Sequence, residues 1–239
     1  MDEPTLMSAL KRQVHRDPQV PIAVWGKEAP SYAEAYSLAQ VLMRYFEGKA
    51  GLASEDAVLV SSPSTMGFFC AVAAIQASGA AAVLSPAGLP REALSPVLRR
   101  TRPRVALVAD PGTCACVRDE LPGAPVFSMG SPDVDAPSMG YMADQAIGLV
   151  DEVFLKVGDV RFDEGRDVEV AFVGGDGGMA VERGSQLALD GRRLAAREGL
   201  REAARVRMSQ PFATREGLVR VYAVLGAGAT MELGAQTSA

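Results

Sequence analysis

Residues 56–85 read DAVLVSSPSTMGFFCAVAAIQASGAAAVLS, and this stretch decides the fold. The apolar run at 57–60 is continuous, which is typical of a strand covered on both faces of its sheet. The Ser-Pro-Ser of 62–64 is a good helix start, and Gly79 is a helix stop. A second apolar run follows at 81–84. Strand, helix and strand in this order predict a βαβ unit with two parallel strands.

The same alternation extends in both directions from this unit. Ser31 and Glu34 have the spacing of a capping box, so we expect a helix to begin there, and Pro90 opens another. We also expect strands at 22–25, 104–108, 124–127, 167–173, 187–189 and 229–233, and helices at 191–206 and 211–226. The sequence therefore predicts an α/β fold with a mostly parallel sheet and helices on both faces.

The composition is that of one globular domain, which we assign to residues 1–239. The net charge of −5 gives no strongly basic surface, so we expect no nucleic acid and no anionic membrane as partners. The single histidine, His15, excludes a histidine-rich metal site, and we expect no metal. Residues of about 130–166 are acidic and weakly periodic, which predicts a long surface connection or, alternatively, an acidic docking surface.

The cysteines and the apolar segments indicate the cellular compartment of the protein. Three cysteines cannot form a disulfide framework, and an odd number suggests a reducing compartment. No apolar run follows a basic start, as a secretory signal would require. The apolar stretch at 68–84 is interrupted by polar residues and is too broken to span a membrane. We therefore expect a cytoplasmic protein.

A glycine cluster follows the strand predicted at 167–173. It consists of Gly174, Gly175, Asp176, Gly177 and Gly178. A strand followed by exposed backbone amides can form an anion-binding site. The cluster lacks the lysine of a P-loop and the spacing of a dinucleotide fingerprint, and it carries a carboxylate of its own. A flexible turn and a phosphate site both stay open at this point.

The order of these motifs resembles a known family. Residues 56–108 look like the N-terminal half of the acyl-adenylate-forming (AMP-binding) enzymes: acyl-CoA synthetases, non-ribosomal peptide adenylation domains and luciferases. Family members carry a strand, a Ser-Pro-type helix start, a helix ending in Ala-Gly-Ala and a further strand in this order. The last strand, at 104–108, reads RVALV where the family has R/K-V-x-L-V. The resemblance covers roughly 25–110 and again 167–233.

The resemblance also assigns two degenerate motifs. The family's phosphate-binding loop, Thr-Ser-Gly-Thr-Thr-Gly-x-Pro-Lys-Gly, corresponds to the cluster at 174–178, where Gly175 and Gly178 match but the hydroxyls at 173, 174 and 176 are lost. Ala180 and Val181 stand where the family has Pro and Lys. The motif Pro-x-Phe-His-x-x-Gly corresponds to 211–217, which has no histidine. Its remnant of the acyl pocket is Phe212, Ala213 and Gly217.

These departures imply a non-catalytic protein. The family's adenine, ribose, metal and lid groups follow this region in longer chains, so we expect no catalytic residue and no cofactor here. The resemblance implies a protein-binding, scaffolding or regulatory subunit in fatty-acid, polyketide or non-ribosomal peptide biosynthesis. The alternatives are the N-terminal part of a split carboxylic-acid-activating ligase and a non-catalytic acyl- or carboxylate-binding module.

The expected partner surface lies at 167–233. We expect an uncovered sheet edge there, since the family's sheet continues into later strands, and an uncovered edge is a template for pairing. We also expect an exposed apolar patch made of Val219, Val221, Tyr222, Val224 and Leu225. Both features predict a homodimer or a hetero-complex, with a carrier protein or a biosynthetic enzyme as the heterologous candidates.

Overall fold

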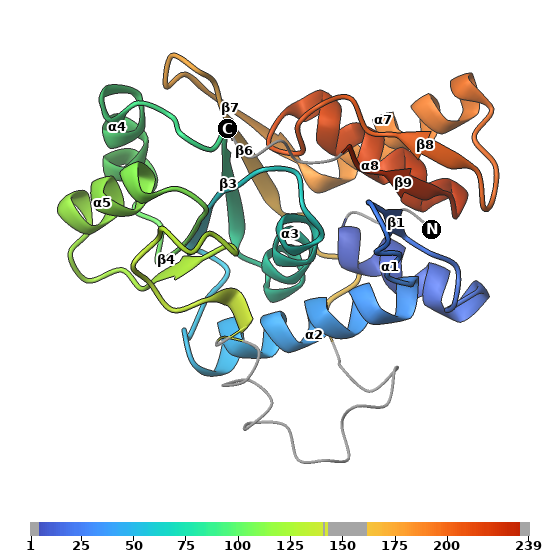
Figure 1. Ribbon diagram of the computed structural model, residues 1–239, viewed down its shortest axis with the longest axis horizontal. Helices are drawn as coiled ribbons and strands as arrows, with labels where there is room; N and C mark the ends of the chain where they lie inside the picture. Colours follow the sequence, from blue (N-terminus) through green and yellow to red (C-terminus); the bar gives the residue numbers. More distant parts are fainter. Residues whose placement is uncertain (1–4, 141, 143–161, 235–239) are drawn as a thin grey trace.

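Two sheets organise the computed structural model, which describes residues 5–140, 142 and 162–234 (Figure 1). The larger sheet has the strand order β5-β4-β2-β3-β6-β7. Its strands are β2 (Ala57–Ser61), β3 (Ala81–Ser85), β4 (Val105–Val108), β5 (Val126–Ser128), β6 (Glu169–Val173) and β7 (Met179–Arg183). Every neighbouring pair is parallel except β6 and β7, which form an antiparallel hairpin. The predicted mostly parallel sheet is confirmed.

Helices cover both faces of this sheet, as the sequence predicts. On one face lie α1 (Leu6–Arg16), α2 (Tyr32–Gly48) and α3 (Met66–Ser78), whose apolar side chains share one core with Val58, Val60 and Leu84. On the other face lie α4 (Arg91–Thr101) and α5 (Pro111–Glu120), which pack on Leu59, Val83 and the other residues of a second core. Alternate residues of β2 therefore enter opposite cores, as the pleat requires.

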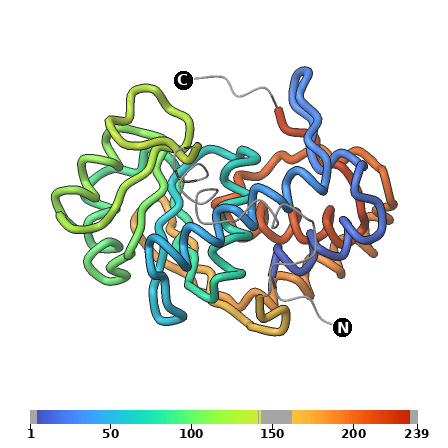
Figure 2. Tube along the Cα trace, turned by 90° about the horizontal axis from the view of Figure 1, so that it is seen from below, coloured from blue at the N-terminus to red at the C-terminus, as the bar shows by residue number. Residues whose placement is uncertain are grey.

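The smaller sheet joins the two ends of the described chain. Its order is β1 (Ala23–Val24), β9 (Thr230–Glu232) and β8 (Arg205–Arg207), with both pairs parallel. The hydroxyl of Tyr32 donates to the carbonyl of Ala229, and that of Thr230 donates to the carbonyl of Pro21, each over 2.7 Å. Figure 2 shows the N-terminal segment in blue beside the C-terminal segments in red. The segment around β1 near the N-terminus and the strand β9 near the C-terminus thus stabilise each other.

Helix ends form near the positions that the sequence predicts when the capping residues are neighbours in sequence. The capping box predicted at Ser31 is present: the Ser31 backbone N–H donates to the Glu34 carboxylate over 2.7 Å, and the Glu34 N–H donates to the Ser31 hydroxyl. The helix α3 stops at Gly79, whose φ is +84°. Its N-cap is Thr65 rather than a residue of 62–64, because the Thr65 hydroxyl accepts from the Phe68 N–H.

The prediction was wrong for residues 187–189 and 199–206, whereas residues 191–198 are helical as predicted. Residues 187–189 are not a strand but lie inside α7 (Gly184–Glu198). The Asp167 carboxylate accepts hydrogen bonds from the backbone N–H and the hydroxyl of Ser185, and it holds the first turn of α7 from a segment distant in sequence. The helix also ends earlier than expected, and the strand β8 follows it.

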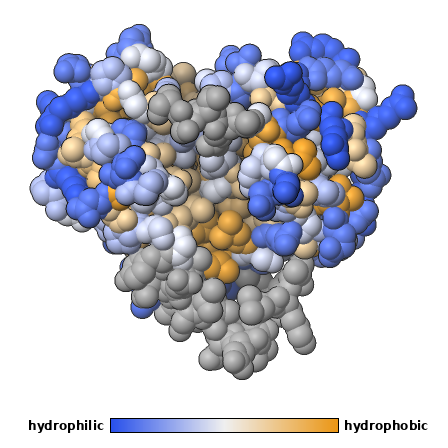
Figure 3. Space-filling view, viewed as in Figure 1, coloured by the Kyte–Doolittle hydropathy of each residue, from blue (hydrophilic) through white to orange (hydrophobic). Residues whose placement is uncertain are grey.

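The residues expected to form an exposed apolar patch on α8 (Arg215–Ala227) are buried. Val221, Val224 and Leu225 have no exposed surface, and Val219 and Tyr222 are buried. Helices α1 and α7 pack on α8, and the Gln13 side chain donates to the Leu225 carbonyl over 2.7 Å. On the face shown in Figure 3, hydrophobic residues gather near the middle and hydrophilic ones cover both flanks. A partner surface therefore needs a different basis.

None of the helices within the described ranges is long and apolar enough to cross a membrane.

Candidate functional site

The glycine cluster forms the loop of the β6–β7 hairpin. The loop 174–178 follows the carboxyl end of β6, and the hairpin projects from the body at the top of Figure 1. The carboxyl ends of parallel strands are where ligands bind in open α/β sheets. The position predicted for a phosphate-binding loop is therefore the position at which this fold would place one.

The loop satisfies most of its own backbone donors. The Gly174 N–H donates to the Gly178 carbonyl over 2.8 Å, and the Gly177 N–H donates to the Gly174 carbonyl over 3.0 Å. The Gly178 N–H donates to the Asp176 carboxylate over 2.8 Å. An anion cradle needs several amides that point at the ligand. Here three of the five loop amides already have acceptors inside the loop.

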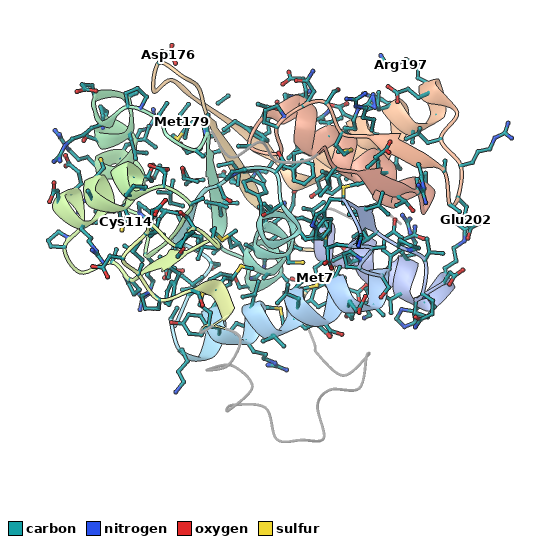
Figure 4. The ribbon with its side chains drawn as sticks, in the orientation of Figure 1. Met7, Cys114, Asp176, Met179, Arg197 and Glu202 are labelled. Carbon is teal, nitrogen blue, oxygen red and sulfur yellow. The ribbon has the colours of Figure 1, made fainter. Side chains whose placement is uncertain are left out.

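The Asp176 carboxylate is part of this closed arrangement. Its Oδ1 atom would lie 2.9 Å from a Cβ at either Gly174 or Gly178, so it sits between the two arms of the loop. The side chain is labelled in Figure 4 at the tip of the hairpin. A carboxylate at this point repels a phosphate and competes with it for the same donors.

A backbone carbonyl of α4 lies against the loop. A Cβ at Gly177 would lie 2.5 Å from the Ala93 carbonyl oxygen, and Gly177 has a φ of +80°. Only glycine meets both conditions, because a side chain here would clash with backbone in a left-handed conformation. The contact presents an acceptor oxygen to the loop, which adds nothing for an anion to bind.

An arginine that the sequence reasoning missed connects the two degenerate motifs. Arg215 lies within the motif at 211–217 and forms an ion pair with Glu182 of β7. Its guanidinium also donates to Asp190 of α7 over 2.6 Å. A hydrogen bond from Gln186 and the nearby guanidiniums of Arg215 and Arg193 lower the pKa of Asp190. The cation is held between two carboxylates of its own chain.

This network borders a surface hollow of about 500 Å³ between α7 and α8. Leu194 and Val219 are its apolar lining, and arginines surround them. Arg193 pairs with Asp190 and Arg220 pairs with Glu198, at 3.3 and 2.9 Å. Together with Arg215, these pairs neutralise much of the positive charge that a phosphate would require.

The residues predicted as the remnant of the acyl pocket are all buried. Phe212 is 1% exposed, and Ala213 and Gly217 are also buried. The Phe212 N–H donates to the Ser64 hydroxyl over 2.8 Å, and its ring lies 6.1 Å from that of Phe68. The Gly217 N–H donates to Thr214, the N-cap of α8. Within the described residues, no hydrogen bond joins these three residues to the loop at 174–178, whereas Arg215 of the same motif pairs with Glu182 of β7.

Metal ligands do not converge in the part of the chain that the structure describes. No group of three or more His, Cys, Asp or Glu side chains there is placed to hold an ion. Cys114 and Cys116 are both buried on α5, and the Cys116 sulfur lies 3.5 Å from the Ser95 hydroxyl. Their spacing therefore reflects packing between α4 and α5.

The fold and its hairpin define the class of protein: an α/β protein with a glycine loop at the carboxyl end of a parallel strand. The family of AMP-binding enzymes matches residues 10–145 in sequence, which is more than half of the 239 residues. The chain belongs to the AMP-binding enzyme family. The match ends before the hairpin, so the loop at 174–178 and the motif at 211–217 lie outside it.

Several solved structures share this fold over nearly the whole chain. VinN is 16% identical with a TM-score of 0.80, over 96% of this chain and 56% of its own length. A red-emitting luciferase from Phrixothrix hirtus is 15% identical with a TM-score of 0.80, and the match covers 98% of this chain and 47% of the luciferase. MbtA from Mycobacterium smegmatis is 18% identical with a TM-score of 0.78, and the match covers 97% of this chain and 44% of MbtA.

The chain spans about half the length of these structures. Among curated proteins, none matches the sequence.

Proposed function

We propose that this chain is a member of the AMP-binding family that does not adenylate and acts as a protein-binding, scaffolding or regulatory subunit. The observation that carries this proposal is the loop at 174–178: three of its five amides donate within the loop, and the Asp176 carboxylate lies between its two arms. By analogy with the family, its setting is fatty-acid, polyketide or non-ribosomal peptide biosynthesis.

The chemistry of adenylation supports this proposal. Transfer of the adenylyl group to a carboxylic acid moves charge onto the leaving pyrophosphate, and cationic groups and a metal ion must stabilise it. The loop offers neither a hydroxyl nor a cation, and Arg215, the cation within the motif at 211–217, is held by Glu182 and Asp190. Loss of one transition-state donor costs about 10²–10³ in rate, and several are replaced here.

The test is acid-dependent exchange of pyrophosphate into ATP, measured with purified protein over a broad panel of fatty, aromatic and amino acids. We expect no exchange above a protein-free control, while an active adenylating enzyme in the same assay gives a strong signal. Exchange that depends on one acid and rises with the concentration of the pure protein would contradict the proposal.

A second candidate function follows from how much of each matched structure this chain covers. Because the chain spans about half the length of the solved adenylating enzymes, it can also be the N-terminal part of a split acid-activating ligase. The same assay separates the two functions. Exchange that appears only after a second polypeptide is added favours the split ligase, and continued absence of exchange favours the non-catalytic subunit.

The state of the cysteines supports a reducing compartment such as the cytoplasm. Cys70, Cys114 and Cys116 are all unpaired and buried. Burial raises the pKa of the Cys70 thiol to about 12, so this thiol is unreactive.

A further inference from the structure

A cationic hollow lies at the end of the larger sheet that is opposite to the glycine loop. Its volume is about 660 Å³, and it is formed by the ends of α2 and α4 and by the segments that lead into β4 and β5. The strands β4, β5 and β6 run in the same direction. Residues 102–104 and 121–125 therefore lie at amino ends of strands, whereas the loop at 174–178 follows a carboxyl end. A molecule bound in the hollow leaves the loop uncovered.

Three cations line the hollow: Lys49, Arg102 and Arg104. Lys49 and Arg102 are exposed, and neither forms an ion pair with a residue that the structure describes. Glu120 is the one carboxylate among the described lining residues, and Arg99, which is not a lining residue, already donates to it over 2.8 and 3.2 Å. The whole chain has a net charge of −5. The hollow is therefore a local concentration of positive charge on an acidic protein.

The third cation is held in place without being neutralised. The Arg104 guanidinium donates to the Ala50 carbonyl over 3.0 Å and lies 3.7 Å from the Asp56 carboxylate. Its side chain is still 52% exposed. A guanidinium has five donors, so Arg104 keeps free N–H groups for a carboxylate of a partner.

The wall between the cations is apolar and ordered. Leu121, Pro122 and Pro125 line it, and the two prolines fix the backbone φ at their positions. The Ala124 N–H donates to the Leu121 carbonyl, and the Ala106 N–H donates to the Pro125 carbonyl, each over 3.0 Å. A wall that is ordered before binding loses little conformational entropy when a partner docks.

The backbone around the hollow disfavours a compact anion such as phosphate. Lys49 and Arg102 are the C-caps of α2 and α4, so both helices end at the hollow. The carbonyl groups of a helix C-terminus carry partial negative charge, which repels an anion that approaches the backbone. Lysine and arginine carry their charges several atoms away from these carbonyls. The arrangement favours carboxylates that are spread over a larger partner and bind at the rim.

We propose that the hollow docks an acidic amphipathic helix of a second protein. Carboxylates of the helix pair with the three cations, and its apolar side chains pack on Leu121 and the two prolines. None of the described lining residues belongs to a strand, so an extended peptide finds no strand to pair with. A helix satisfies its own backbone hydrogen bonds and needs only side-chain contacts. Docking here rests on the protein-binding role proposed above, and charge complementarity selects the partner.

Fluorescence anisotropy with a labelled peptide tests the docking. The peptide is about 15 residues long, enough to form a helix, with glutamates on one face and leucines on the other. We expect saturable binding with a Kd below about 100 μM at low salt, and weaker binding as salt screens the ion pairs. A peptide with glutamine in place of each glutamate should bind at least about tenfold more weakly. No saturable binding of the acidic peptide, or equal binding of both peptides, would refute the proposal.

Two variants of equal net charge locate the binding site. Lys49→Gln with Arg102→Asn removes two charges from the hollow, and asparagine tolerates the left-handed backbone at Arg102, whose φ is +43°. Arg201→Gln with Arg205→Gln removes two charges at exposed positions elsewhere. We expect the first variant to bind the acidic peptide about tenfold more weakly and the second to bind it as the parent does. Equal affinities of the two variants, both with the melting temperature of the parent, would place the peptide elsewhere and overturn the proposal.

Competition with inorganic tripolyphosphate distinguishes a protein helix from a small polyanion. We expect it to displace the peptide no better than sodium chloride of the same ionic strength. Displacement by an equimolar amount of tripolyphosphate would overturn the choice of a helix. The exchange assay for adenylation does not involve this hollow. A protein that neither exchanges pyrophosphate nor binds the peptide refutes the docking site alone, and one that does both refutes the loss of adenylation alone.

Discussion

Replacing Gly191 with valine is expected to lower the free energy of unfolding by about 3 kcal/mol, the upper end for overpacking a core. A Cβ at this position would lie 2.6 Å from the Tyr222 Cβ and 3.0 Å from the backbone of Ala223. Neither atom can move without separating α7 from α8. For a chain of this size the melting temperature should fall by roughly 6–12 °C, which differential scanning calorimetry measures.

Gly226→Ala is the matched control for this experiment. Gly226 also lies in α8, but no atom lies within 4 Å of the position where its Cβ would be. Alanine should leave the stability unchanged or raise it by up to about 1 kcal/mol through helix propensity. If the Gly191→Val variant has the same melting temperature as the parent protein, the close approach of α7 and α8 is wrong. The pairing of Asp190 with Arg215, which depends on that approach, is then also wrong.

Phe212→Ala is expected to cost about 4 kcal/mol of unfolding free energy, as the removal of a buried aromatic ring usually does. The ring is 1% exposed and packs beside Phe68, so truncation leaves a cavity that the neighbours cannot fill. The midpoint of urea denaturation reports the loss. Phe212→Leu, which keeps most of the volume, should cost far less.

The same experiment decides between a structural and a ligand-binding role for Phe212. In an open acyl pocket the ring would face solvent, and its removal would change stability little. A Phe212→Ala protein as stable as the parent would therefore favour an open acyl pocket and contradict the packing described above.

The sequence predicts the first half of the fold well because its signals are local. Continuous apolar runs at 57–60 and 81–84 are strands buried on both faces, and each pairs in parallel as expected. The capping box at Ser31 and the stop at Gly79 act within a few residues, so a pattern of neighbours suffices to find them. The glycine loop after β6 is likewise marked by composition alone.

The second half depends on contacts that local patterns do not contain. The Asp167 carboxylate that starts α7 comes from the segment before β6, and the residues at 187–189 suit a strand or a helix equally well. The apolar face of α8 is covered by α1, from the other end of the chain. Arg215 was missed because its partners, Glu182 and Asp190, become neighbours only after the hairpin and α7 have folded.

The central claim is that the hairpin loop does not hold the phosphates of ATP. Titration calorimetry of the purified protein with Mg-ATP tests it most directly, since the loop is the group that would bind them. Because three of the five loop amides donate within the loop and Asp176 lies between its arms, the protein should give no saturable heat up to millimolar nucleotide. A saturable isotherm with a Kd below ~100 μM, more than about 5 kcal/mol of binding free energy, would contradict the account.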